Sequence, residues 1–243
     1  MRVRLDKFFT TLGRLSRRET AVAVRRGEIT VNGRPATRAD MQVDPETDAV
    51  AHLGEPLVYR EFVYLWLNKP AGYVSATEDG RLPVVTELAP PEYARLSLFP
   101  CGRLDRDTVG LLLLTNDGGL GHALTSPRRG VRKVYRFRVD APLPKEAEER
   151  LLAGMVLGEE RCRSACLSAD GDRMGGTVTL TEGKYHEVKR MMAALGSTVT
   201  ELERISFAGI ALDPALARGE CRPVTDEELT ALRAAASPKT QKE

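Results

Sequence analysis

Basic residues are concentrated at the amino-terminal end of the chain. Residues 1–38 contain ten basic side chains and three acidic ones, a formal charge of +7, whereas the remaining residues carry −5 and the whole chain only +2. Such an asymmetry between segments is typical of a basic binding module attached to a second domain. Because 243 residues suffice for two unequal domains with separate cores, we expect the chain to fold as two domains.

The basic segment has the pattern of a small module of two helices and a hairpin. Apolar residues at i, i+3, i+4 and i+7 within residues 5–12 predict a short helix. Ser16 and Glu19 form a capping box that begins a second helix, which ends at Gly27. The alternating segment 28–36 contains a strong tight-turn signal, Asn-Gly, and predicts a β-hairpin.

The arginines of these two helices are expected on the side exposed to solvent, because a helix of a small module buries only one face. Charge runs are usually ordinary solvated surfaces, but such surfaces mix both signs and this one barely does, which favours phosphate binding. The arginines concerned are Arg14, Arg17, Arg18, Arg25 and Arg26. The order of the elements, with R-L-D-K-F at the start and V-N-G-R at the hairpin, also resembles the alpha-L RNA-binding module.

The charge bias ends in residues 40–60, a segment that is rich in turn formers and is predicted to be irregular. We therefore place a boundary near residue 60, with an RNA-binding domain at 1–60, a second domain at 61–236 and a disordered polar tail at 237–243. The second domain has strand patterns at 62–67, 135–139, 177–181 and 198–202, and helix patterns at 145–153, 185–195 and after Thr225. Strands outnumber helices without alternating regularly with them, which predicts an α+β fold with a largely antiparallel mixed sheet.

The cysteines and the apolar segments indicate the cellular compartment in which such a protein is expected. Four cysteines are too few and too irregularly spaced for a disulfide framework, and no apolar stretch approaches the ~18–20 residues that span a bilayer. The amino terminus has no apolar signal core, so we expect a cytoplasmic protein with reduced thiols, acting as a monomer. The chain lacks a P-loop, a dinucleotide-binding fingerprint and a metal-spaced cluster of ligands, so we expect neither cofactor nor metal.

Polar side chains suited to chemistry or binding are concentrated in three segments of the second domain. Residues 103–107, with two arginines and two aspartates, lead into a buried strand, although such a loop more commonly forms a surface salt bridge. In the predicted helix 185–195, His186, Lys189 and Arg190 share the face opposite the apolar one, where they could bind a carboxylate or a phosphate. A third segment is a cationic strip without acidic residues: Arg128, Arg129, Arg132, Lys133, Arg136 and Arg138.

Motifs that follow one another along the chain connect these segments. G-R-L-D-R-D-T-x-G-L-L-L-L-T-N-D-G begins at residue 102, after L-N-K-P-A-G-Y-V-S at 67–75. It is followed by T-S-P-R at 125–128, K-V-Y at 133–135 and E-G-K-Y-H-E-V-K-R-M at 182–191. In this order, and behind an alpha-L module, the motifs are similar to those of the RsuA-type pseudouridine synthases over residues 62 to about 230.

The resemblance implies roles for individual residues. It implies that Asp105 is the catalytic residue and that Tyr135 lines the pocket, where it offers a stacking surface to a flipped-out base. It also implies that a basic side chain of the V-K-R segment pairs with the aspartate, Lys189 being favoured and Arg190 the alternative. Asp107 is a competing carboxylate, and only motif position favours Asp105 over it. The further RNA contacts predicted in this domain are Arg103, Arg128, Arg129, Lys133 and Arg190.

The resemblance also implies an activity and a partner. Uridine would be converted to pseudouridine without cofactor or metal, since no group is transferred in and no redox change occurs. T-S-P-R and K-V-Y most resemble members that act on small-subunit (16S) ribosomal RNA, while relatives that act on 23S RNA share G-R-L-D. The predicted partner is ribosomal RNA, with 16S favoured, either free or in an assembling small subunit. The alternative class is a non-catalytic RNA-binding or ribosome-assembly protein, against which the presence of Asp105, Tyr135 and Lys189 argues.

Overall fold

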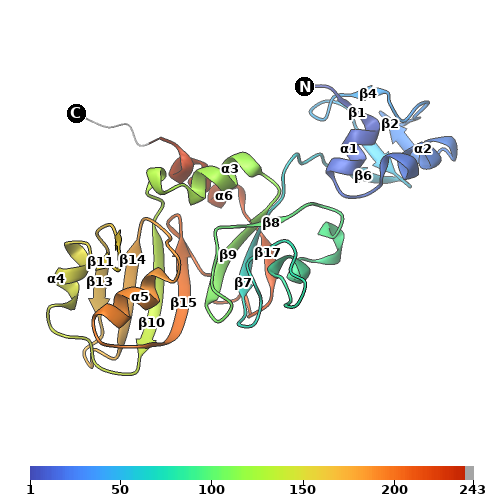
Figure 1. Cartoon of the computed structure of the whole chain (residues 1–243). Coiled ribbons are helices and arrows are strands. Elements are labelled where there is room, and N and C mark those ends of the chain that lie inside the picture. Colours follow the sequence, from blue (N-terminus) through green and yellow to red (C-terminus); the bar gives the residue numbers. More distant parts are fainter. Residues whose placement is uncertain (239–243) are drawn as a thin grey trace. The chain divides into compact units, whose positions relative to one another are not determined.

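The chain forms two compact units in the computed structural model, which describes residues 1–238 (Figure 1). The first unit is Met1–Val63 together with Pro90–Ser97, and the second is Tyr64–Ala89 together with the chain from Leu98 onward. The chain therefore leaves the first unit, begins the second, and returns to the first for eight residues. No local pattern in the sequence indicates this return.

The first unit packs two helices against short strands. Its helices are α1 (Leu5–Thr11) and α2 (Arg17–Arg25), and its strands are β1 (Val3–Arg4), β2 (Ile29–Val31), β3 (Arg34–Pro35), β4 (Gln42–Val43), β5 (Val50–His52) and β6 (Glu55–Leu57). β1 pairs with β4, and the others form a sheet in the order β3-β2-β5-β6. Phe8, Phe9 and Ile29 are buried in its core. The predicted order of two helices and a hairpin is confirmed, as is the capping box, in which Ser16 and Glu19 each accept the other's backbone N–H.

The prediction that residues 40–60 are irregular is wrong, because β4, β5 and β6 lie there. β5 and β6 form a hairpin whose turn residues, Leu53 and Gly54, both have positive φ, 52° and 85°. Two-residue hairpin turns with this geometry usually carry Asn-Gly or Asp-Gly. A leucine at the first turn position, between strands of three residues each, leaves no recognisable hairpin signal.

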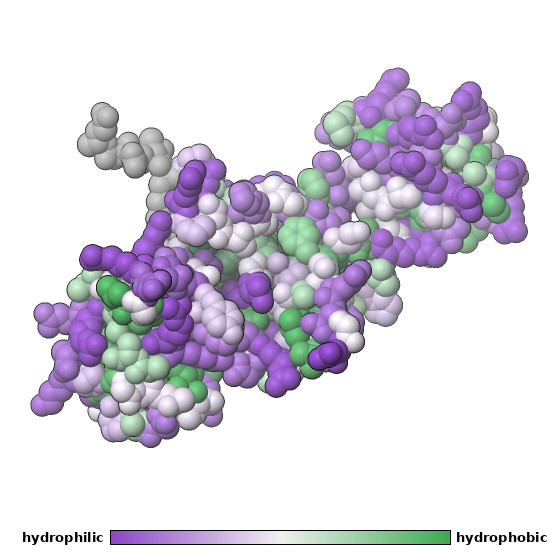
Figure 2. All heavy atoms as spheres, in the orientation of Figure 1, coloured by the Kyte–Doolittle hydropathy of each residue, from purple (hydrophilic) through white to green (hydrophobic). Residues whose placement is uncertain are grey.

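The returning segment is attached to α2 by an ion pair. It contains the short helix η2 (Pro91–Tyr93), after which Arg95 donates to both carboxylate oxygens of Glu19, at 2.6 and 3.2 Å. The guanidinium of Arg95 lowers the pKa of Glu19 to about 2. Hydrophilic side chains cover much of the visible surface of this unit (Figure 2).

Within residues 1–238, nine strands of the second unit form one mixed sheet in the order β13-β14-β10-β15-β9-β7-β17, with β16 paired to β15 and β8 to β9. The strands are β7 (Tyr64–Lys69), β8 (Phe99–Cys101), β9 (Val109–Thr115), β10 (Lys133–Val139), β13 (Cys166–Ala169), β14 (Gly175–Leu180), β15 (Val199–Phe207), β16 (Ile210–Ala211) and β17 (Cys221–Pro223). β9 and β15 pair in parallel, and the neighbouring pairs are antiparallel. This confirms the α+β fold, with strand ends shifted by a few residues.

Helices pack around this sheet. They are α3 (Gly118–Thr125), α4 (Ala147–Leu152), α5 (Glu187–Ala194) and α6 (Asp226–Ala236), with the short helices η1 (Val85–Leu88) and η3 (Pro127–Arg129) and a hairpin of β11 (Val156–Leu157) and β12 (Glu160–Arg161). α5 packs against β15 and β11, and α3 packs against α6 and β8. The polar tail predicted at 237–243 begins differently, because Ser237 still caps α6, and from residue 239 it lies outside the described residues. In the described part of the chain, no helix is both long and apolar enough to cross a membrane.

The parallel pair at the centre of the sheet depends on a glycine. Gly110 in β9 lies opposite Arg204 in β15 and has φ of 104°. A Cβ at this position would lie 2.4 Å from the carbonyl oxygen of Arg204, so any other residue would separate the two backbones. This close approach places the loop that leads into β9 beside β15 and β10.

Candidate active site

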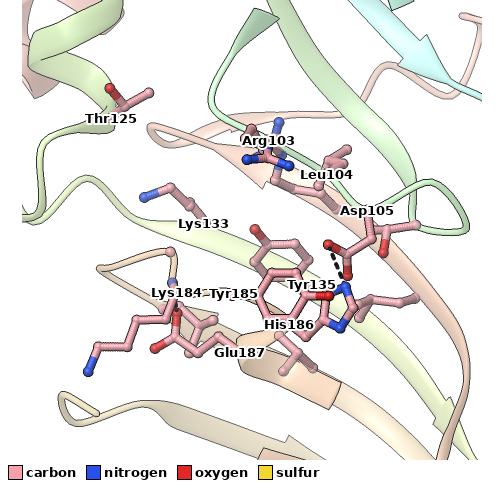
Figure 3. Close-up of a pocket in the computed structure, with 16 residues that line it drawn as sticks. Arg103, Leu104, Asp105, Thr125, Lys133, Tyr135, Lys184, Tyr185, His186 and Glu187 are labelled. Atoms are coloured by element: carbon pink, nitrogen blue, oxygen red, sulfur yellow. Dashed lines mark hydrogen bonds and ion pairs between the residues drawn. The ribbon is translucent and has the colours of Figure 1, made fainter. Parts of the chain in front are cut away.

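A cavity of about 260 Å³ lies in the second unit where this loop, β10, β15 and the start of α5 meet (Figure 3). Asp105 and Arg103 line it from the loop, Tyr135 from β10, and His186 from the segment before α5. The segments that the motifs singled out are thus brought together around one pocket, although they are far apart in the sequence.

The loop that carries Asp105 is held by a buried lysine. Lys69, at the end of β7, is fully buried and its ammonium donates to the backbone carbonyls of Pro70, Asp105, Arg106 and Thr108, at 2.8–3.2 Å. Burial lowers the pKa of Lys69 to about 8. An ammonium placed in a ring of carbonyls fixes the backbone of a loop that has no secondary structure of its own.

A second anchor holds the residue before Asp105. The hydroxyl of Ser75 donates to the carbonyl of Leu104 at 2.8 Å and accepts from its N–H at 3.0 Å. The L-N-K-P-A-G-Y-V-S motif therefore acts on the G-R-L-D loop through Lys69 and Ser75. Sequence reasoning missed both residues, although a lysine at the end of an otherwise apolar strand was a usable signal.

Two side chains approach the carboxylate of Asp105 directly. His186 Nε2 lies 3.5 Å from Oδ1, and Lys189 Nζ lies 3.3 Å from Oδ2. Lys189 is closer still to Asp107, at 2.6 Å, and this hydrogen bond lowers the pKa of Asp107 although burial acts in the opposite direction. The side chain of Asp107 is 71% exposed and does not line the pocket, whereas that of Asp105 is 28% exposed and does.

Arg190, the alternative partner for Asp105, is engaged elsewhere. Its guanidinium donates to the carboxylate of Glu160 at 2.7 Å and to the carbonyl of Leu157 at 2.6 Å. The prediction that His186 shares a helix face with Lys189 and Arg190 is wrong, because α5 begins only at Glu187. His186 precedes the helix in the left-handed conformation, with φ of 49°, and reaches Asp105 from there.

Tyr135 enters the pocket from the buried face of β10. The alternation of the strand places Lys133, Tyr135 and Phe137 on that face, and Tyr135 is 8% exposed. Lys133 also lines the pocket, and burial, with the nearby charge of Arg204, lowers its pKa to about 8.

The predicted cationic strip of residues 128–138 is wrong as a single surface, because the pleat divides it. Lys133 points into the pocket, whereas Arg136 and Arg138 lie on the opposite face, each within 3.9 Å of a carboxylate. Arg128 is exposed and Arg129 half-buried on η3, just after α3. Alternating strand geometry separates basic residues that a count along the sequence groups together.

Arg204 is a pocket residue that sequence reasoning missed. It is fully buried, its Nε donates to the carbonyl of Leu111 at 2.6 Å, and its guanidinium lies 5.0 Å from the ring centre of Phe207. Within residues 1–238, its two terminal nitrogens have no hydrogen-bond partner. In the alternating strand pattern around it, an arginine is typical of an exposed position, so burial could be recognised only from the sheet order.

Three buried side chains beside the pocket bring together atoms of the kind that ligate metals. The ligand atoms of Cys162, Glu182 and Glu187 lie within 4.8 Å of one another. Each carboxylate already accepts a backbone N–H, Glu182 from Arg163 at 2.6 Å and Glu187 from Lys184 at 2.9 Å. Burial raises the pKa of Glu187 to about 7, with a contribution from its hydrogen bond to Glu182.

The predicted RNA-binding arginines of the first unit are exposed: Arg14, Arg17, Arg18, Arg25 and Arg26. A hollow on this unit is lined by Arg4, Arg17, Arg25 and Arg38, together with Asp6 and Asp40. In residues 1–238, no acidic side chain lies within ion-pair distance of Arg17 or Arg25, whereas Arg4 and Arg38 are paired with the two aspartates. Arg17 and Arg25 are thus available to phosphate groups.

Comparison with known families defines the class of protein to which this fold and site belong. Residues 63–194 match the family described as RNA pseudouridylate synthase, and residues 3–48 match the S4 domain. The chain is therefore a pseudouridine synthase with an amino-terminal S4 domain, in the place where the alpha-L RNA-binding module was predicted.

Individual relatives narrow this class. The chain is 38% identical over 233 residues to Ribosomal small subunit pseudouridine synthase A of Escherichia coli K12, covering 95% of this chain and 100% of that protein. It is 45% identical over 231 residues to YtzG, an uncharacterised RNA pseudouridine synthase of Bacillus subtilis, covering 93% and 97%. A crystal structure of a pseudouridylate synthase superimposes with a TM-score of 0.66 at 34% identity, covering 95% and 99%. The chain belongs to the RsuA-type pseudouridine synthases, and RNA is its partner.

Proposed function

We propose that this enzyme converts one uridine of small-subunit (16S) ribosomal RNA to pseudouridine, with Asp105 as the catalytic carboxylate. The observation that carries the proposal is the position of Asp105. Its carboxylate lines a pocket, has Lys189 Nζ at 3.3 Å and His186 Nε2 at 3.5 Å, and stands on a loop fixed by Lys69 and Ser75. A carboxylate fixed beside a cation is suited to work as an anion.

The chemistry requires such a group. The bond between the sugar and N1 of uracil breaks, the ring turns, and a bond forms from the sugar to C5, while a proton leaves C5 and one is taken up at N1. Asp105 acts in its ionised form, as a nucleophile or as a stabiliser of positive charge. Lys189 favours that form, and Tyr135 offers a ring on which the flipped-out uracil stacks.

The choice of the small-subunit RNA rests on two supports. T-S-P-R at 125–128 and K-V-Y at 133–135 resemble members that act on 16S RNA, and the relative named Ribosomal small subunit pseudouridine synthase A aligns with 95% of the chain. A large-subunit target is the competing proposal. Recognition of an assembling subunit, the monomeric state and the cytoplasmic location remain predictions.

The contacts to RNA are assigned to both units. Arg103 lines the pocket and is exposed, and Lys133 lies deeper in it, so these two would meet the flipped nucleotide. Arg128, Arg129 and Arg190, which do not line the pocket, and the arginines of the first unit are assigned to phosphates of the RNA outside the target nucleotide. Phosphate contacts of this kind position the substrate without reading its bases.

The test is to map pseudouridine in both ribosomal RNAs from cells with and without this protein. One position that is lost from 16S RNA with the protein, and restored by it in vitro, is the expected result. The variant Asp105→Asn keeps the shape of the side chain but removes its charge, so it should form no pseudouridine while binding RNA nearly as well as wild type. Asp107→Asn is the matched control, because Asp107 lies two residues farther along the same loop and does not line the pocket. Full activity of Asp105→Asn would refute the assignment.

A further inference from the structure

Two aromatic rings stack at the rim of the pocket. The rings of Tyr185 and His186 are 3.8 Å apart between centres and inclined by 19°, a nearly parallel stack. His186 in turn reaches the carboxylate of Asp105, so that a chain of contacts runs from the tyrosine ring to the proposed catalytic group (Figure 3). Both rings line the pocket.

The exposure of Tyr185 is not explained by the fold. Its side chain is 73% exposed, although large aromatic residues are usually buried for most of their area. One face of the ring is covered by His186, and the exposed area leaves the other open to solvent. An exposed ring beside a pocket is available for stacking with a ligand.

The backbone that presents these rings is strained and firmly held. His186 adopts the left-handed conformation, which is uncommon for a residue with a side chain and has to be enforced by the surrounding structure. The ends of the segment are joined by the buried pair of Glu182 and Glu187, and the Glu187 carboxylate accepts the N–H of Lys184. The backbone carbonyl of Tyr185 accepts a hydrogen bond from Arg190 at 3.4 Å. The tyrosine ring is thus mounted on a fixed support.

We propose that Tyr185, backed by His186, is a stacking platform for a nucleobase of the RNA that flanks the target uridine. This inference rests on the proposed function. When one base is flipped out of an RNA strand, its neighbours lose their stacking partner, and proteins that bind single-stranded RNA commonly replace it with an aromatic ring. The platform would make the enzyme sensitive to the nucleotide beside its target.

Tyr135 and Tyr185 differ in burial, and this difference assigns them different roles. Tyr135 is 8% exposed and stands on β10 inside the pocket, where the target uracil would enter. Tyr185 is 73% exposed at the rim, where the RNA strand would pass. The buried ring is therefore assigned to the flipped base and the exposed ring to its neighbour.

The test measures the RNA affinity of the full-length protein while Tyr185 and single bases of the RNA are removed separately and together. The probe is a short single-stranded fragment of the ribosomal RNA that contains the mapped uridine, together with fragments in which one nucleotide at a time carries no base. Tyr185→Ala should weaken binding of the intact fragment by roughly 5- to 150-fold, the range for loss of one base–aromatic stack. Tyr185→Phe keeps the ring and should bind within about twofold of wild type.

The position of the stacked base follows from the same cycle. If Tyr185 stacks on a flanking base, removing that base should weaken wild type by the same factor and have almost no further effect on Tyr185→Ala. The proposal is overturned if Tyr185→Ala binds the intact fragment as tightly as wild type does, or if the substitution weakens binding of every fragment by the same factor. It is also overturned if the substitution loses its effect only when the base of the target uridine itself is removed.

Two controls keep the outcomes separate. Because Tyr185 is largely exposed, the thermal midpoint of Tyr185→Ala should match that of wild type, which excludes a folding defect as the cause of weak binding. Failure of the proposed function would appear earlier, as the absence of any mapped pseudouridine that depends on the wild-type protein.

Discussion

Replacing Lys69 by methionine tests how the loop of Asp105 is held. Methionine has nearly the same length and fits an apolar site, but it cannot donate a hydrogen bond. The four carbonyls that surround the ammonium, those of Pro70, Asp105, Arg106 and Thr108, would lose their common donor. Two of these carbonyls belong to Asp105 and its neighbour, so stability and activity should fall together.

The size of the effect follows from two opposing contributions. Three protons of the ammonium make charge-assisted hydrogen bonds that contribute about 1.5–3 kcal/mol each. Against this, burial lowers the pKa of Lys69 from 10.5 to about 8, which corresponds to a cost of about 3 kcal/mol for keeping the charge inside. The net loss of unfolding free energy is therefore about 1.5–6 kcal/mol, or a fall in thermal midpoint of at least about 3 °C for a unit of this size.

The assay is built into the chain, because Trp66 is the single tryptophan and is buried in β7, three residues before Lys69. Its fluorescence during heating reports on the second unit alone. Lys145→Met, at an exposed position, is the matched control and should leave the midpoint unchanged. The rate of pseudouridine formation by Lys69→Met should fall by about 100-fold, the cost of a catalytic group displaced by about 1 Å.

The pH dependence gives an independent check of the same reasoning. The folded-state pKa of Lys69 lies below that of the unfolded chain, so between about pH 8 and pH 10.5 the unfolded state binds more protons and wild type gains stability as the pH rises. Lys69→Met lacks this group, so the gap in stability between the two proteins should widen over that range. Equal thermal midpoints at pH 7, or a gap that narrows with rising pH, would refute the argument.

Two further predictions concern other parts of the molecule. The double variant Arg17→Gln, Arg25→Gln should flatten the log–log dependence of RNA affinity on salt by about 1.4, as expected for two lost phosphate contacts to single-stranded RNA, while Arg138→Gln should not change the slope. Because the pKa of Glu187 is raised above its unfolded value, its contribution to stability is present below about pH 4.5 and is lost as the pH rises through about 7. The thermal midpoint of Glu187→Gln relative to that of wild type should therefore rise from pH 5 to pH 8. The same difference between the two midpoints at pH 5 and at pH 8 would contradict this.

Local patterns in the sequence predicted the elements and one part of the site. The first two helices, the capping box of α2 and the buried strands have signals within a few residues, because caps and alternation act over short distances. Asp105 was found through a motif rather than through physics, since a loop aspartate alone is indistinguishable from one in a surface ion pair.

The sequence did not reveal the site residues whose roles depend on contacts between distant segments. Lys69 reaches the carbonyl of Asp105 across 36 residues, and the Nε of Arg204 donates to Leu111 across 93. Neither contact has a local pattern, because each depends on which strands become neighbours in the sheet. The divided cationic strip of β10 is similar, since the pleat decides which basic side chains meet.

The return of the chain at residues 90–97 has a consequence for the order in which the protein can assemble during synthesis. Glu19 lies in a helix that leaves the ribosome early, but its partner Arg95 follows only after strand β7 has been made. At roughly 5–20 residues per second, the interval from residue 63 to residue 97 takes about 2–7 seconds. During that time the first unit lacks residues 90–97, although β7, the first strand of the second unit, has already been synthesised. The first unit therefore cannot complete its fold until part of the second unit has been synthesised.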